Sequence, residues 1–470
     1  MEKANRKKLI RLPAKASFFY ILSSMVARGV GVVGTPIFTR LLSPTEYGLY
    51  PLYNSWLGIV SAAASLELHG SVMYRGLSRY EGDKDSFLCA TYGLFLCSFS
   101  AVTLFLLLFS NLFTRVSGLN TGLLIIMLIQ IFFSVTLSLY SAKARYDYDY
   151  KTQVRLNILN ALLTPLFSIL ILFGTSYKGE SRILGSAIAT VICAFPLLKQ
   201  IKRGGKPLFN KEIWKYLLRL NLPLLPHYLS VTLILRIGEV VLERVHGLTA
   251  LGKYSVALSL GLSLSMITGG ILSALSPWLT RKLKEEKYGK IREIMLLSVI
   301  SLFLISLVIL AFAPETIKLI APSGYRDALY AVYPLSLSVI PMFISNAVMS
   351  GEVFFEKNVK SSLPAVITAA ITLLLALLLL PRLDYRYTGV LLFLSYTTLA
   401  ILNIKNFKAL SGEAVIDYKK CASVFLLAIG YATLLMLFNG VFLSRLLLVI
   451  PVLPLLFRYG LKVYKEIREV

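Results

Sequence analysis

Long apolar runs constrain this chain more than any other feature. Segments of about 20 mainly apolar residues recur throughout the 470-residue sequence, and each can cross the ~30 Å hydrocarbon core of a bilayer as a helix. Charged residues make up 16% of the chain, against about 25% in a typical globular domain. The sequence therefore predicts an all-α polytopic membrane protein.

Fourteen transmembrane helices are predicted from these runs. No stretch between them has the size and polarity of a separate soluble domain. The predicted spans are residues 17–39, 47–68, 86–110, 119–141, 153–174, 182–200, 217–238, 250–278, 290–312, 329–351, 361–381, 387–404, 421–439 and 441–460.

Basic residues are distributed unevenly around the predicted spans. The chain carries 49 Lys and Arg against 24 Asp and Glu, a formal net charge of +25. If the amino terminus is cytoplasmic, most of these basic residues lie in cytoplasmic connections, as the positive-inside rule requires. This topology explains the net positive charge, so no nucleic-acid partner is expected. It predicts a plasma (inner) membrane protein with both termini in the cytoplasm and an attraction to anionic membrane lipids.

A basic segment at residues 199–215, KQIKRGGKPLFNKEIWK, divides the chain. Its two glycines and its proline interrupt any helix. We expect an N-terminal lobe at residues 1–200, a cytoplasmic linker at 201–216, a C-terminal lobe at 217–410 and an accessory helix pair at 411–470.

The opening pattern of the chain returns 204 residues later. TRLLSPTEYGLY at residues 39–50 is echoed by ERVHGLTALGKY at residues 243–254, with identities at Arg40 and Arg244 and at three further pairs. The offset spans six helices, so both copies enter the membrane in the same direction. This predicts two parallel six-helix lobes around a central cavity, with the transport site between the lobes.

The sequence lacks the patterns that catalytic and metal sites need. Neither a phosphate-binding glycine loop nor a nucleophile elbow is present. The histidines lie in separate elements and the cysteines show no paired spacing. We therefore expect no enzymatic activity, no metal and no cofactor. The residues concerned are His69, His227, His246, Cys89, Cys97, Cys193 and Cys421.

Arginines inside the apolar spans are the main candidates for substrate binding. Arg28 lies in the middle of the first span, where a charge costs about 2.5–3.5 kcal/mol on insertion scales. Arg236 lies in the seventh span, and the 204-residue offset places it one helical turn from Arg28 on the same face. Guanidinium groups bind phosphate oxygens in a bidentate manner. Two arginines that face one cavity therefore predict a diphosphate-binding site.

Each candidate also has a purely structural interpretation. Arg28 can be a structural arginine that snorkels to the membrane surface or is paired inside its helix bundle, and Arg236 and Glu239 can simply neutralise each other. Glu67 and Arg75 lie close enough to the membrane surface to be solvated. In the functional interpretation, Arg75 helps to bind the substrate, while Glu67 and Glu239 balance charge or couple transport to a cation.

Four stretches of the chain carry a resemblance to a known family. They are the first span with Arg28 running into FTRLLSPTEYGLY, then ASLELHGSVMYRGLSRY, LYSAKARYDYDYKTQVRLNILNALL and PLSLSVIPMFISNAVMSGEVFFEKNVKSSLPAVITAAI. With them the chain resembles the polysaccharide-unit flippases of the multidrug/oligosaccharidyl-lipid/polysaccharide exporter superfamily. The resemblance covers nearly the whole chain but contains no catalytic motif.

This resemblance implies a function and a set of partners. It implies transport of a lipid-linked oligosaccharide diphosphate, carried on undecaprenol, to the outer leaflet by alternating access. H+ or Na+ is the coupling ion if there is one, and a monomer suffices. Arg28 matches an arginine of related peptidoglycan-precursor flippases, whose extra helix pair helps to accommodate the lipid tail. Gly238-Glu239 departs from the acidic–basic pair that family members often carry in helix seven.

A cation-coupled multidrug exporter of the same superfamily is the alternative function. Its site should be acidic and aromatic, and the mid-span Arg28 and Arg236 speak against that. A membrane glycosyltransferase would need catalytic residues in its outer loops. Those loops are short here, and the longest lies at residues 313–328.

Overall fold

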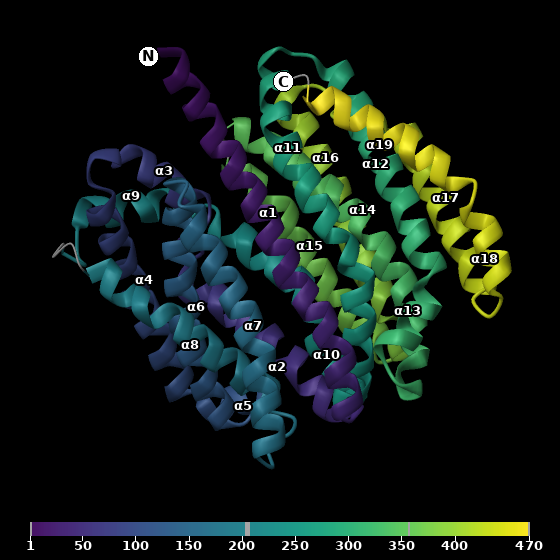
Figure 1. Cartoon of the computed structure of the whole chain (residues 1–470), viewed down its shortest axis with the longest axis horizontal. Coiled ribbons are helices and arrows are strands. Elements are labelled where there is room, and N and C mark those ends of the chain that lie inside the picture. The colour runs from purple at the N-terminus through teal and green to yellow at the C-terminus, as the bar shows by residue number, and fades with distance from the viewer. Residues whose placement is uncertain (1, 203–206, 356–357, 469–470) are drawn as a thin grey trace. The chain divides into compact units, whose positions relative to one another are not determined.

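The computed structural model describes residues 2–202, 207–355 and 358–468, which form helices and turns without any strand (Figure 1). Eleven described segments are long and apolar enough to cross a membrane. The predicted all-α polytopic membrane protein is therefore confirmed. The chain forms two compact units that divide between Thr232 and Leu233, inside helix α10.

Unit 1 is a bundle in which α6, α7 and α8 pack on one another and α1 packs along α7. Its elements are α1 (Glu2–Leu41), α2 (Pro44–Ser65), α3 (Ser71–Arg79), η1 (Glu81–Asp83), α4 (Lys84–Leu108), α5 (Ser110–Ser117), α6 (Thr121–Tyr146), α7 (Tyr150–Gly174), α8 (Ser181–Lys202), α9 (Lys211–Asn221) and the start of α10 (Leu225–Gly261).

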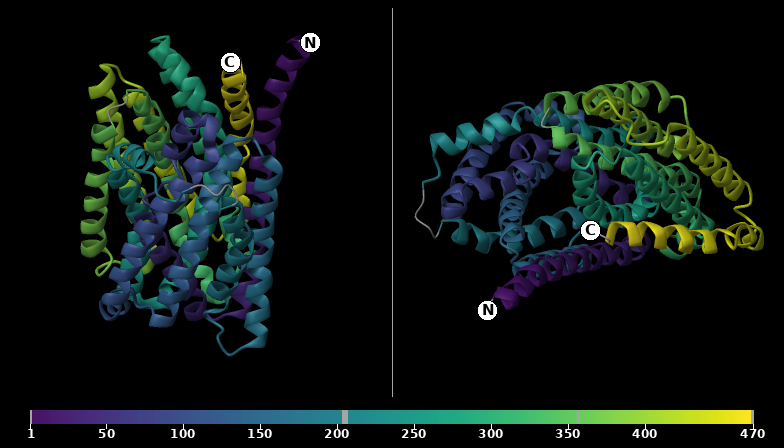
Figure 2. Two further views of the ribbon diagram at one scale, coloured as in Figure 1. Left: turned by 90° about the vertical axis from the view of Figure 1, so that its left-hand side faces the viewer. Right: turned by 90° about the horizontal axis from the view of Figure 1, so that it is seen from above.

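Unit 2 is built around α14, which packs against α11, α12 and α16. After α10 its elements are η2 (Leu262–Leu264), α11 (Ser265–Lys284), α12 (Tyr288–Ala311), α13 (Ala313–Ile320), η3 (Ser323–Ala328), α14 (Leu329–Glu352), η4 (Val353–Phe355), α15 (Asn358–Leu379), η5 (Tyr385–Tyr387), α16 (Thr388–Ser411), α17 (Tyr418–Leu437), α18 (Phe442–Val449) and α19 (Val452–Arg468). The last helices, α17 and α19, diverge from α18 and both pack on α12 (Figure 2).

The 204-residue offset recurs in the helix boundaries of the two units. α4 begins at Lys84 and α12 begins 204 residues later, at Tyr288. The starts of α5, α6, α7 and α8, moved by the same offset, fall within four residues of the starts of α13, α14, α15 and α16. The helix break also recurs, because Ser43 separates α1 from α2 and Gly247, with φ 78° and ψ 175°, interrupts α10. The predicted internal repeat is thus present in the order and spacing of the helices.

Helices cover all fourteen predicted spans, although the boundaries differ in places. The segment Leu225–Lys284 has 60 residues and contains the predicted span 250–278 and most of the predicted span 217–238. Neither α1 nor α2 is among the eleven segments. The predicted span at residues 441–460 is divided into α18 and α19, because Pro451 between them cannot donate a helical hydrogen bond.

Helix α9 was not expected from the sequence. The predicted span at residues 217–238 begins inside α9, and α10 starts only at Leu225. Asn210 caps α9 by accepting a hydrogen bond from Ile213 N at 3.1 Å. The Trp214 indole donates to the Ala90 carbonyl at 2.8 Å. α9 is a short amphipathic helix that packs on α3 and α4, and hydropathy alone does not distinguish it from the start of a span.

An ion pair between a buried arginine and a partly exposed glutamate attaches α18 to α13 in unit 2. Arg445 on α18 is 2% exposed, and its two terminal nitrogens donate to both carboxylate oxygens of Glu315 on α13, at 2.8 and 2.6 Å. Arg445 also donates to the Ala311 carbonyl. These hydrogen bonds hold the pKa of the Glu315 carboxyl below its usual range. Bidentate arginine–carboxylate pairs fix geometry as well as energy, so this pair sets where α18 lies.

The contact between α7 and α8 yields a first prediction. A Cβ on Gly185 would lie 2.2 Å from Ser168 Oγ and 2.4 Å from Ser168 N, so Gly185→Ala forces α8 away from α7. Such overpacking costs about 1–3 kcal/mol. Thermal unfolding in detergent should show a lower Tm for this variant. Gly29→Ala, whose Cβ meets no atom within 4 Å, is the control and should not lower the Tm.

The Arg445–Glu315 pair predicts how stability depends on pH. Because folding lowers the pKa of Glu315, the pair stabilises unit 2 above the unfolded pKa of about 4.3, and this contribution is lost as pH falls through the lower folded-state value. Unfolding scans of wild type and Glu315→Gln from pH 7 to pH 3 should converge at low pH. The exposed pair Arg292–Glu413, at 3.4 Å, provides the control, and Glu413→Gln should run parallel to wild type. A constant gap between wild type and Glu315→Gln would contradict this account.

Candidate functional site

One face of α7 carries a row of polar side chains. Gln153, Asn157, Asn160, Thr164 and Ser168 follow one another at intervals of three or four residues, so they lie on one side of the helix. The opposite side carries exposed leucines, as expected for a surface that faces lipid. These are Leu159, Leu162, Leu166 and Leu170, which are 44–57% exposed.

The polar row lines two adjoining cavities in unit 1. The first has a volume of about 320 Å³ and lies between α1, α6, α7 and the turn after α2. The second has a volume of about 240 Å³ and lies between α1, α2, α7 and α8. Asn157 and Asn160 line both cavities, so the two form one groove along α7, here called the α7 groove.

Small side chains of α1 form the other wall of the α7 groove. Ser23, Ser24, Ala27, Gly31 and Gly34 all line it. A Cβ added to Gly31 would meet no atom within 4 Å, which shows that the space beside this residue is open. The composition of α1 therefore creates volume next to the polar face of α7.

Several polar atoms in the α7 groove have no hydrogen-bond partner among the described residues. Gln153 is only 8% exposed, and its Oε1 is unpartnered, as are Asn160 Oδ1 and Tyr20 Oη. In contrast, the hydroxyls of Thr164 and Ser168 donate to carbonyls of their own helix at 2.8 and 2.7 Å. A buried polar group without a partner costs about 1–3 kcal/mol. The groove is therefore built to hold water or a polar ligand.

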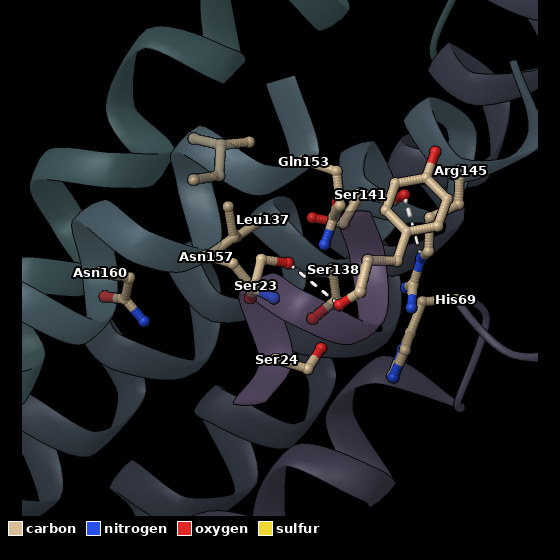
Figure 3. Close-up of a pocket in the computed structure, with 12 residues that line it drawn as sticks. Ser23, Ser24, His69, Leu137, Ser138, Ser141, Arg145, Gln153, Asn157 and Asn160 are labelled. Carbon is tan, nitrogen blue, oxygen red and sulfur yellow. Dashed lines mark hydrogen bonds between the residues drawn. The ribbon is translucent and has the colours of Figure 1, made fainter. Parts of the chain in front are cut away.

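Arg145 and His69 lie together at one end of the groove, next to Gln153 and Ser141, while Asn160 lies at the far end of this view (Figure 3). Arg145 Nε donates to the Ser141 carbonyl at 3.3 Å. Burial and the positive charge of Arg145 lower the pKa of His69, so the imidazole is neutral at pH 7. This end of the groove thus carries its positive charge on Arg145.

Arg182 marks the other end of the α7 groove. Its guanidinium carbon lies 4.9, 4.6 and 4.2 Å from the ring centroids of Phe38, Tyr47 and Tyr50, which come from α1 and α2. An ion pair requires a carboxylate within 4.0 Å of the guanidinium, and in the described part of the chain none lies that close to Arg182. Arg182 makes no hydrogen bond to a described residue, so its N–H donors remain for other partners. Sequence reasoning missed Arg182 because it begins a span, where a charge is unremarkable.

The structure places the predicted residues of unit 1 at separate points. Arg28 is exposed on α1, lines neither cavity, and makes no ion pair or hydrogen bond with a described residue. Glu67 Oε2 lies 3.4 Å from His69 Nε2. Arg75 is exposed on α3. Arg28 is thus not paired inside the helix bundle of unit 1, and its role in substrate binding stays a prediction.

In unit 2 the predicted proximity of Arg236 and Glu239 is confirmed. Arg236 Nη1 lies 3.3 Å from Glu239 Oε2, and the side chains are 30% and 3% exposed. Arg236 thus neutralises a buried carboxylate. That Arg28 and Arg236 face one cavity stays a prediction.

Comparison with protein families identifies one match over more than half of the chain. Residues 14–283 match the family described as "Polysaccharide biosynthesis protein". No curated protein sequence matches the chain significantly.

Solved structures of membrane transporters and of a flippase share this fold. An inward-facing multidrug resistance MATE family transporter has a TM-score of 0.66 at 14% identity, covering 84% of this chain and 99% of its own. The lipid II flippase MurJ, in an inward closed conformation, has a TM-score of 0.63 at 14% identity, covering 96% and 99%. A MOP superfamily transporter from Pyrococcus furiosus Vc1 (DSM3638), whose reversed binding-pocket polarity suggests a different function, has a TM-score of 0.57 at 15% identity, covering 90% and 97%.

The two faces of α7 predict different accessibility to water. In a cysteine-free background, Asn157→Cys in the α7 groove should react with a charged thiol reagent in lipid nanodiscs. Leu162→Cys on the opposite face, although 52% exposed, should not react, because a thiol in lipid does not ionise. Labelling rates measured by mass spectrometry check this. An Asn157→Cys thiol that reacts as slowly as the Leu162→Cys thiol would show that the groove is closed to water.

Proposed function

Because the chain belongs to the polysaccharide biosynthesis protein family, we propose that it is a flippase for a lipid-linked oligosaccharide diphosphate. It moves this substrate from the cytoplasmic to the outer leaflet of the plasma membrane by alternating access, with both chain termini in the cytoplasm. The observation that carries the proposal is the polarity of the α7 groove. Among the described residues that line it, Arg145 and Arg182 are charged and none is acidic. Such a groove favours an anionic substrate.

The arginines have distinct roles in this proposal. Arg28 binds the diphosphate, because it is exposed and has no partner among the described residues that would have to be displaced. Arg236 contributes from unit 2, where Glu239 balances its charge in the absence of substrate. Arg75, exposed on α3, attracts the anionic headgroup before it enters. Glu67, whose Oε2 lies 3.4 Å from His69 Nε2, balances the charge of the substrate-binding arginines or couples transport to a cation.

The shared fold supports the transport cycle and the type of cargo. One protein with this fold is a transporter in an inward-facing conformation, and another is a flippase for lipid II. No step of the cycle requires a cofactor, a metal or an enzymatic reaction. H+ or Na+ can couple through the carboxylates, and a monomer contains every residue that the cycle uses.

A cation-coupled multidrug exporter is the second candidate function. The fold similarity to a MATE family transporter favours it. A cationic drug would, however, meet Arg145 and Arg182 in the α7 groove without an opposing carboxylate among the lining residues. Drug resistance on overexpression without any effect on glycan export would favour this candidate over the flippase.

Arg28→Ala tests the arginine mechanism. Loss of the guanidinium removes a charge-assisted contact to phosphate, so glycan export in a complementation assay should fall at least tenfold while the protein stays in the membrane. Arg28→Lys should retain part of the activity, since it keeps the charge but loses the bidentate geometry.

Arg326→Ala, which removes an exposed arginine of η3, is the matched control and should export normally. Export by Arg28→Ala at the level of this control would refute the role of Arg28. If glycan export continued unchanged in cells that lack this protein, the proposed flippase function would be refuted.

A further inference from the structure

The α7 groove has the size of a small-molecule site. Small-molecule pockets have volumes of roughly 300–1,000 Å³. The two cavities of about 320 and 240 Å³ adjoin each other. Along α7, Gln153 and Ser168 are fifteen positions apart, which corresponds to about 22 Å at the α-helical rise. This is enough for more than the phosphate groups of a lipid-linked substrate.

The lining of the groove is rich in amides and hydroxyls. Gln153, Asn157 and Asn160 present carboxamides, each with two donors and an acceptor. Gln153 is more than nine-tenths buried and its Oε1 has no described partner, and Asn160 Oδ1 also has none. An apolar ligand would leave these groups unpaired, which is a costly outcome in a water-poor site. Hydroxyl-rich ligands satisfy them, so sugar residues suit this part of the groove.

Arg182 adds a fixed positive charge at one end of the same groove. Phe38 and Tyr50 also line this cavity, and together with Tyr47 their rings surround the guanidinium. The rings restrict the orientation of the guanidinium without consuming its N–H donors, which are matched to a carboxylate. Arg145, at the opposite end, differs because it is exposed and its Nε already donates to Ser141.

We propose that the α7 groove binds an acidic sugar of the transported oligosaccharide, with its carboxylate on Arg182 and its hydroxyls on Asn157 and Asn160, while Gln153 binds a neighbouring sugar of the same chain. This assignment rests on the proposed flippase function and names its substrate class as a glycan that contains a uronic acid. It separates two tasks within the protein. Arg28 and Arg236 bind the diphosphate common to all such substrates, and the α7 groove selects the glycan.

Direct binding of monosaccharides to the purified full-length protein tests this proposal. The probes are D-glucuronate, D-glucose and inorganic phosphate, titrated by ligand-observed NMR. Glucuronate should bind at least about tenfold more tightly than glucose, as one charge-assisted hydrogen bond predicts. Arg182→Gln should reduce glucuronate to the affinity of glucose without changing the affinity for glucose. Arg182→Lys should recover part of the difference.

A matched pair of glycine variants tests the location. Gly31→Leu fills the second cavity, because a Cβ at this position points into open space, and it should weaken the binding of both sugars. Gly29→Leu adds the same side chain to the same helix, where a Cβ also meets no atom within 4 Å, but Gly29 does not line the groove. This control should bind both sugars as wild type does.

Four outcomes would overturn the proposal. The first is that wild type binds glucuronate and glucose with equal affinity, and the second is that it binds neither sugar. The third is that phosphate binds as tightly as glucuronate and that Gly31→Leu does not weaken this phosphate binding. The fourth is that Arg182→Gln no longer binds glucose and also has a lower Tm. The last would show that Arg182 only joins α1, α2 and α8. Failure here is distinct from failure of the flippase, because an export assay that still depends on the chain and on Arg28 would leave the proposed function in place.

Discussion

Polar side chains on a membrane helix need protein partners, because lipid offers none, and the arrangement of unit 1 follows from this constraint. The polar row of α7 cannot face hydrocarbon, so α1 lies along it, while the leucines on the opposite face stay exposed. α1 approaches with serine, alanine and glycine instead of larger side chains, which leaves a groove where a tight apolar contact would otherwise form. The site is thus a consequence of two complementary helix faces.

Two arginines, one in each unit, are held in different ways. Arg182 is surrounded by three aromatic rings and meets no described carboxylate, whereas Arg445 in unit 2 is neutralised by Glu315 and fixes the position of α18. The same residue type therefore serves two purposes. An arginine paired with a carboxylate holds helices together, and an arginine held by aromatic faces keeps its donors for an external anion.

The sequence predicted the fold well because membrane helices are specified locally. Each span is identified by its own hydropathy. The similarity between residues 39–50 and 243–254 predicted a repeat with an offset of 204 residues, and the helix starts agree with this offset as far as α16. The Arg236–Glu239 contact was predictable from helical spacing alone. Helix α9 was missed because its apolar residues merge with those that follow. The candidate site was only partly foreseen, since Arg28 attracts attention by its cost in a span while Arg182 at a span end does not.

The sequence by itself determined that this chain is a polytopic all-α membrane protein with an internal repeat. Both properties depend on quantities that can be read along the polypeptide, namely the length of the apolar segments and the spacing of the repeated sequence. Only the tertiary structure decided which polar residues form a site. The amides of α7 are separated from Arg182 by a turn and from Gly31 by more than one hundred residues, and nothing in their spacing brings them together. Packing of α1, α2 and α8 around α7 does so, because the choice of helix neighbours depends on complementary faces rather than on sequence distance.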